Sequence, residues 1–154
     1  MDSNPPSVLQ LRISLRGVSP PVWRRLLILE EITIADLHHV MQLAMGWNDE
    51  HLHQFMIRGW RYGGHREGAL QCFDGPDTLS LAAFGLHEHE RFAYVYDFTA
   101  WWLHDVRVDV DESVQKLGRR ISSGIPSLQQ YVLSIGGSLP TLTRCTRRNP
   151  CRQS

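Results

Sequence analysis

The sequence lacks any apolar run approaching the roughly 20 residues that cross a bilayer. Its first seven residues are polar and proline-rich, and no basic stretch followed by an apolar one marks a secretory signal. Cysteine is scarce, and three cysteines at scattered positions argue against a disulfide framework and favour a reducing compartment. We therefore expect a cytoplasmic protein that makes no contact with a membrane.

Net charge is also absent, but the zero is a cancellation between two parts of the chain. All 16 acidic residues lie in residues 1–115, whereas residues 116–154 carry seven basic residues and no acid. Such a basic segment favours contact with nucleic-acid phosphates, for which Arg144, Arg147 and Arg148 are the candidates. The alternative is a solvated segment, or one that folds onto the acidic body, because a charge run without a recognition motif allows either.

The length of 154 residues and the 42% share of hydrophobic residues predict one globular domain with its own core. Apolar residues that alternate or run together between turn residues predict its strands. The expected strands are residues 8–16, 22–29, 51–58, 92–98 and 101–110. One strong helix lies between the second and third strands. This order predicts an α+β fold, with an antiparallel or mixed sheet covered by one main helix.

The main helix is expected over residues 33–45, with Thr33 as its N-cap and Gly46 as its stop. Its apolar residues recur at helical spacing and form one stripe. They are Leu37, Val40, Met41, Ala44 and Met45. Shorter helical segments are expected at residues 79–84 and 127–135.

Aromatic residues alternate along the fourth expected strand. They are Phe92, Tyr94, Tyr96 and Phe98. A row at this spacing either packs in a core or stacks bases, and the absence of interleaved lysine or arginine favours the core. Only Thr99 and Ala100 separate this strand from the next, which predicts a tight antiparallel hairpin or one bulged strand.

Histidines are the sharpest chemical feature of the sequence. His51 and His53 are two residues apart, so on a strand they project from the same face. His104 lies on another apolar-patterned strand face, and His38 on the helix is placed to contribute from above. Three converging imidazoles, His51, His53 and His104, would suit zinc or another borderline metal. The alternative is that these histidines are packed and hydrogen-bonded, because His-x-His is a weak motif.

Two carboxylates are candidate acid–base groups or partners that orient His104, namely Asp97 and Asp105. Asp97 falls on the face opposite the aromatic row, where we expect it to pair with an arginine. Catalysis by either carboxylate remains an alternative that spacing does not resolve.

Four short motifs carry tryptophan, histidine or other aromatic residues at characteristic spacings: residues 20–25 (PPVWRR), 44–47 (AMGW), 51–55 (HLHQF) and 94–98 (YVYDF). Trp102 and His104 follow the last of them. Together these motifs resemble the plasmid pRiA4b ORF-3-like domains.

The resemblance implies an α/β roll without an established activity, carried on plasmids or insertion sequences. Some relatives bear a resolvase-like name. A serine resolvase needs an activated serine with clustered arginines, and this set of residues is not assignable here. Thr99 and Ala100 stand where the family signature has Gly and Asp. We expect a disordered N-terminus at residues 1–7, the family domain at 8–115 and a divergent basic segment at 116–154. The expected function is a non-enzymatic accessory or interaction domain; the alternatives are a nucleic-acid-binding protein and a metal-dependent enzyme.

Overall fold

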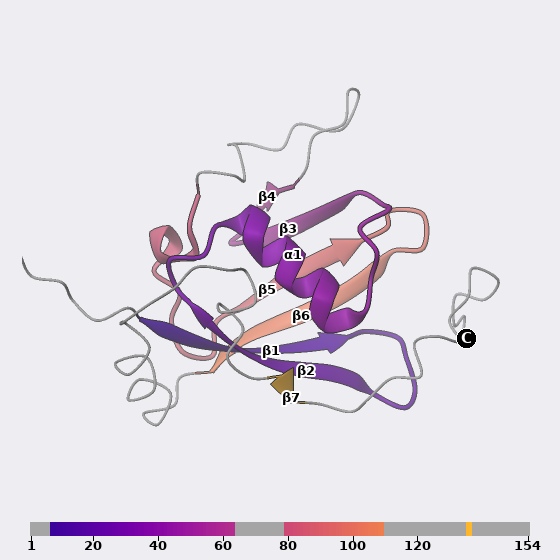
Figure 1. Cartoon of the computed structure of the whole chain (residues 1–154), viewed down its shortest axis with the longest axis horizontal. Helices are drawn as coiled ribbons and strands as arrows, with labels where there is room; N and C mark the ends of the chain where they lie inside the picture. The colour runs from indigo at the N-terminus through magenta and orange to yellow at the C-terminus, as the bar shows by residue number, and fades with distance from the viewer. Residues whose placement is uncertain (1–6, 64–78, 110–134, 137–154) are drawn as a thin grey trace, which may run out of the picture.

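The computed structural model describes residues 7–63, 79–109 and 135–136 of the chain. Its strands form one sheet in the order β4-β3-β5-β6-β1-β2-β7, and every neighbouring pair is antiparallel (Figure 1). The strands are β1 (Val8–Leu15), β2 (Val22–Leu29), β3 (His53–Ile57), β4 (Trp60–Tyr62), β5 (Arg91–Tyr96), β6 (Trp102–Asp109) and β7 (Ile135–Gly136). The helical elements are α1 (Ile34–Met45) and the 3₁₀ turn η1 (Leu81–Phe84).

The prediction of an α+β roll with one main helix covering the sheet is wrong. The fold is mostly antiparallel sheet with a single short α-helix in its described part. The 12 residues of α1 give a helix about 18 Å long, whereas seven strands spaced about 4.8 Å apart extend over almost 30 Å. α1 therefore covers part of one face, in front of β3, β5 and β6 in Figure 1, and forms no layer of its own.

The bounds of α1 are confirmed, and its end residues explain them. Thr33 Oγ1 accepts a hydrogen bond from the backbone N–H of Asp36 at 3.1 Å, which satisfies one of the free donors of the first turn. Gly46 ends the helix with φ at 74°, a left-handed conformation that costs little only without a side chain. The apolar stripe predicted for the helix is buried throughout.

An arginine ties the end of α1 to the sheet. Arg24 of β2 is buried, and its Nε donates to the backbone oxygen of Ala44 at 2.9 Å. The last carbonyls of a helix carry partial negative charge and lack partners within the helix. The guanidinium therefore supplies a cation where α1 has no basic residue of its own in the last turn.

The β5–β6 connection is a hairpin rather than one bulged strand, since Tyr96 pairs with Trp102. The strand ends before Phe98 because Asp97 and Trp101 both take φ of 56° and turn the chain. Phe98 is consequently 40% exposed, and the predicted aromatic core row consists of its other three members.

The core lies between α1 and the sheet face that it covers. Leu11 and Ile13 of β1 are fully buried there together with Phe55 of β3 and Tyr94 of β5. The helical turn expected at residues 79–84 is confirmed as η1. Of the helix expected at residues 127–135, only Ile135 lies among the described residues, and it belongs to strand β7 instead. Across the described ranges, no helix has the length and apolar character needed to span a bilayer.

Candidate functional site

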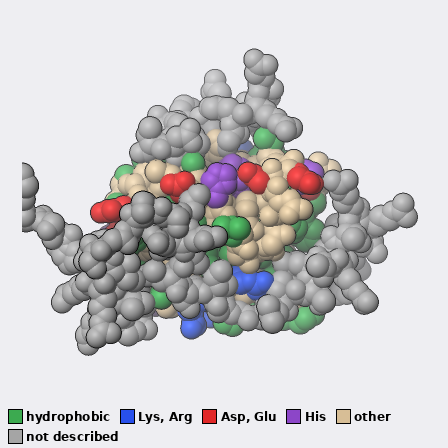
Figure 2. Space-filling view, viewed as in Figure 1, with side chains coloured by type: hydrophobic (Ala, Val, Ile, Leu, Met, Phe, Trp, Pro, Cys, Tyr) green, Lys and Arg blue, Asp and Glu red, His purple; other side chains and the backbone are tan. Residues whose placement is uncertain are grey.

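Histidine side chains gather under and beside α1, where the helix faces β3. His38 of α1 is buried, and its ring stacks on that of His53 with the centroids 3.4 Å apart and the planes inclined by 7°. On the molecular face that carries α1, histidine atoms lie between acidic side chains (Figure 2). The cluster thus combines imidazoles and carboxylates at the boundary between core and solvent.

Four residues of this cluster close a ring of hydrogen bonds. The backbone N–H of Asp49 donates to Gln42 Oε1 at 2.8 Å, and Gln42 Nε2 donates to the Tyr94 hydroxyl at 2.8 Å. The hydroxyl lies 2.9 Å from His38 Nδ1, and His38 Nε2 lies 2.7 Å from Asp49 Oδ1. The Asp49 carboxylate can only accept, so His38 Nε2–H donates to it. In a neutral imidazole Nδ1 then accepts, and the Tyr94 hydroxyl, which accepts from Gln42, donates to it.

Burial sets the protonation of these groups. It lowers the pKa of His38 more than the neighbouring Asp49 raises it, so the contact between them is a hydrogen bond from a neutral imidazole rather than an ion pair. Burial and the nearby His38 lower the pKa of His53 to about 3. Burial also raises the pKa of the Tyr94 hydroxyl, which is fully enclosed. Near neutral pH the ring therefore contains one uncharged imidazole and one uncharged phenol, and the imidazole of His53 stacked on it is uncharged as well.

The histidines predicted as metal ligands lie in three different surroundings. His51 is half-exposed, with Nε2 3.8 Å from Asp97 Oδ2. His53 lies beneath His38, and its Nε2 is buried without a hydrogen-bond partner. His104 of β6 is fully buried; its Nδ1 donates to the backbone oxygen of Tyr94 at 3.2 Å, and burial lowers its pKa to about 4.

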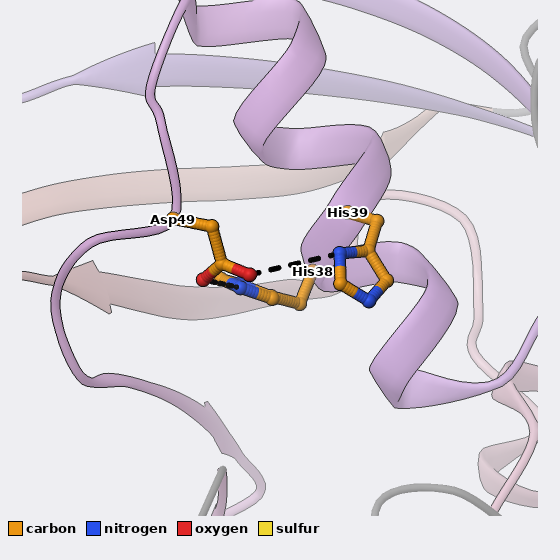
Figure 3. Close-up of side chains that lie close together, drawn as sticks. All are labelled: His38, His39 and Asp49. Carbon is orange, nitrogen blue, oxygen red and sulfur yellow. Dashed lines mark hydrogen bonds and ion pairs between the residues drawn. The ribbon is translucent and has the colours of Figure 1, made fainter.

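The structure brings together a different set of potential ligands. Among the described residues, His38, His39 and Asp49 have ligand atoms that all lie within 4.8 Å of one another, and the three predicted histidines form no such group (Figure 3). Of these three residues, the sequence pattern indicates only His38, as a contributor from above the strand histidines. The signal for them in the sequence is weak: a second histidine next to the first, and an aspartate three residues after the glycine that ends the helix.

The two predicted acid–base carboxylates serve the local structure. Asp97 Oδ1 accepts from the backbone N–H groups of Thr99 at 3.0 Å and Ala100 at 3.3 Å, and no arginine among the described residues forms the expected ion pair with it. Asp105 Oδ2 lies 2.6 Å from Nε of Arg16 at the protein surface. Neither carboxylate is hydrogen-bonded to His104.

A row of arginines crosses the opposite face of the sheet. Arg91 of β5 pairs in register with Arg107 of β6, Arg107 with Arg12 of β1, and Arg12 with Arg25 of β2. Arg12 alternates with the core residues of β1, which places the row on the face away from α1. Four positions on adjacent strands extend over about 14 Å. We call these four residues the arginine row.

The arginine row is only partly neutralised. Arg107 pairs with Asp109 at 2.7 Å, whereas none of the described carboxylates forms an ion pair with Arg12, Arg25 or Arg91. An open pocket of about 290 Å³ lies on this face. It is lined by Arg12, Ser14, Arg91, Asp105 and Arg107.

One tryptophan accompanies the arginine row. The guanidinium carbon of Arg12 lies 5.1 Å from the Trp23 ring centroid, and that of Arg25 lies 5.8 Å from it. The predicted nucleic-acid contacts Arg144, Arg147 and Arg148 lie outside the described residues. The positive surface that the structure does describe is therefore the arginine row.

The family described as plasmid pRiA4b ORF-3-like protein matches residues 7–122 of the chain. The chain belongs to this family. The resemblance inferred from the tryptophan and histidine motifs is thereby confirmed.

Two relatives of this plasmid pRiA4b ORF-3-like protein have no assigned activity. The uncharacterized protein y4hQ of Sinorhizobium fredii (strain NBRC 101917 / NGR234) is 33% identical over 107 residues, which cover 67% of this chain and 54% of y4hQ. The crystal structure of MM3350 from Methanosarcina mazei Go1, a protein of unknown function, is similar with a TM-score of 0.57 at 29% identity, covering 67% of this chain and 59% of that one. The chain thus spans about half the length of its curated relative.

Proposed function

We propose that this protein is a cytoplasmic, non-enzymatic accessory domain of a plasmid or mobile element, and that its arginine row binds single-stranded nucleic acid. The register of the row carries the proposal. Like charges directly opposite each other on neighbouring strands destabilise a sheet. An anionic ligand laid across the strands relieves that repulsion, and three of the four guanidinium groups have no ion pair with a described carboxylate.

The shape of the row favours a polymer over a single small anion. Its length of about 14 Å exceeds what one phosphate group can contact. Arginine pairs with phosphate oxygens through two parallel N–H groups, and an aromatic ring beside such cations offers a stacking surface for an unpaired base. Trp23 lies beside Arg12 and Arg25 in this position. A sheet face with arginine and tryptophan therefore suits a single strand.

The hydrogen-bonded ring beneath α1 supports a role without catalysis. Its phenol and its imidazole are buried and satisfied by one another, so neither is placed to attack a substrate or take a proton from one. The family description names plasmids, which supports carriage on a mobile element. Arg144, Arg147 and Arg148 of the basic segment would add phosphate contacts to those of the row.

Fluorescence anisotropy with a labelled single-stranded oligonucleotide, measured at several salt concentrations, tests the proposal on the full chain. Each phosphate contact adds about 0.7 to the slope of log affinity against log salt for single strands. Replacing Arg12 and Arg91 together by glutamine is expected to lower that slope by about 1.4 and to weaken binding. Arg61→Gln is the matched control, because Arg61 is exposed on β4 at the far edge of the sheet.

Three results would contradict the proposal. The first is no binding at low salt. The second is an equal loss for each removed charge in Arg61→Gln and in the double variant, which would indicate general charge attraction. The third is binding that the double variant keeps and that a triple variant of Arg144, Arg147 and Arg148 loses, which would assign the contact to the basic segment alone.

A further inference from the structure

We infer that His38, His39 and Asp49 form a binding site for an exchangeable divalent transition-metal ion, with zinc as the reference ion. Each residue offers one ligand atom, and these atoms all lie within 4.8 Å of one another. His38 Nε2 lies 2.7 Å from Asp49 Oδ1, and His39 Nδ1 lies 3.9 Å from Asp49 Oδ2. Zinc binds imidazole nitrogen and carboxylate oxygen at about 2.0–2.2 Å, so ligand atoms around one ion lie at most about 4 Å apart.

The adjustment that an ion requires falls on the side chains that can move. His39 and Asp49 are about half-exposed, with 50% and 45% of their side-chain surfaces accessible, whereas His38 is fixed in the core. Figure 3 shows the His39 ring and the Asp49 carboxylate facing each other, with the His38 ring seen edge-on beside the carboxylate. Rotations of the two exposed side chains that shift their ligand atoms by about 1 Å bring all three ligand atoms within reach of one ion.

The surroundings of the three ligands resemble those of built metal sites. Imidazoles that bind metal are held at their second nitrogen by a hydrogen bond, and the Tyr94 hydroxyl occupies this position against His38 Nδ1. Gln42 Oε1 accepts from the backbone N–H of Asp49 and so fixes the chain that carries the carboxylate. Asp49 itself takes φ of 54°, which directs it back toward α1.

The proton of His38 is conserved when the ion binds. In the metal-free ring this proton is on Nε2 and points at Asp49. The ion takes its place there, and the proton moves to Nδ1, where the Tyr94 oxygen accepts it. Tyr94 then accepts from both His38 and Gln42, and its own hydroxyl proton loses His38 as an acceptor. One hydrogen bond is thus exchanged for one metal–nitrogen bond, which favours a reversible site.

His53 is excluded from the ligand set by its stacking on His38. The two rings are nearly parallel and 3.4 Å apart, so an ion in the plane of one ring lies well out of the plane of the other. Three protein ligands with two of them half-exposed leave a coordination position open to solvent, as in exchangeable rather than closed structural zinc sites. The hydrogen-bonded ring is complete without an ion, and the fold therefore does not depend on one.

Isothermal titration calorimetry with zinc chloride on the metal-stripped full chain tests the site. One ion per chain is expected, and His39→Ala and Asp49→Asn should each lower the affinity at least tenfold. The matched control is His51→Ala, since His51 is a half-exposed histidine 3.8 Å from a carboxylate but has no third ligand nearby among the described residues. Its affinity should equal that of the wild type, and cobalt(II) in place of zinc should show visible absorption that disappears in His39→Ala.

The inference is overturned if the wild type takes up no zinc, if both ligand variants bind as tightly as the wild type, or if His51→Ala weakens binding as much as they do. If Asp49→Asn lowers the melting temperature, only the zinc affinity of His39→Ala tests the site, because His39 takes no part in the hydrogen-bonded ring. A metal-stripped chain that unfolds would likewise overturn the claim that the ion is exchangeable.

Discussion

Acid should destabilise this protein in a way that is traceable to one side chain. His104 is fully buried on β6, with Nδ1–H donating to the Tyr94 backbone oxygen and Nε2 without a hydrogen-bond partner. A second proton on this imidazole would place a charge in the core opposite no carboxylate. Burial accordingly lowers its pKa from 6.5 to about 4.

The sign and size of the effect follow from where the proton binds. Below pH 6.5 the unfolded chain takes up a proton that the folded chain refuses until the pH reaches about 4. The stability due to the neutral imidazole is therefore complete above 6.5, declines between 6.5 and 4, and changes no further below that. At about 1.4 kcal/mol for each pH unit, the decline amounts to about 3 kcal/mol of unfolding free energy.

Urea unfolding of the wild type and of His104→Asn between about pH 4 and about pH 7 measures this term. The asparagine amide can still donate toward the Tyr94 oxygen but does not titrate. The variant should be the less stable protein near pH 7, and the gap should close by about 3 kcal/mol as the pH falls. Titration of His53 and of the carboxylates occurs in both proteins and cancels in the difference.

His89→Asn, at a histidine with 72% of its side chain exposed, should follow the wild type at every pH. A gap between wild type and His104→Asn that stays constant with pH would refute the reasoning.

Two further changes probe the hydrogen-bonded ring and the end of α1. Tyr94→Phe removes the hydroxyl shared by Gln42 and His38 and leaves buried polar atoms unpaired. It should lower the free energy of unfolding, measured in urea, by about 2–3 kcal/mol. A loss below about 0.5 kcal/mol would show that water replaces the hydroxyl. Gly46→Ala places a side chain at φ of 74° and should cost about 1 kcal/mol in the same assay, although nothing lies within 4 Å of the new methyl group; an unchanged midpoint would contradict the strain argument.

Local elements were predictable because their causes are local. The ends of α1 depend on Thr33 and Gly46, and β1 and β2 follow from alternation and turns in neighbouring residues. Errors at strand ends have the same origin: the positive φ of Asp97 and Trp101 ends β5 two residues before the aromatic alternation does. The fold class failed because the helix has the strongest periodic signal in the chain, although it is one element beside seven strands.

The candidate sites depend on contacts that a single sequence does not encode locally. Alternation correctly places Arg24 and Arg25 on opposite faces, but only the strand register aligns Arg25 with three arginines from distant parts of the chain. The histidine spacing identified His53, yet its stacking on His38 joins the helix to a strand that follows it. Asp49 reaches its neighbours because the chain reverses after the helix, which a pattern of residue types does not reveal.

The place of β1 in the sheet has a consequence for synthesis and truncation. β1 precedes every other described strand in the chain, yet it lies between β2 and β6, and its pairing with β6 joins Leu15 to His104. A nascent chain can form the β1–β2 hairpin early, but the other edge of β1 stays unpaired until β6 has left the ribosome. Contacts so distant in sequence slow folding, and an open strand edge invites pairing with other chains. Truncations that end before Trp102 should therefore aggregate rather than fold into a smaller domain.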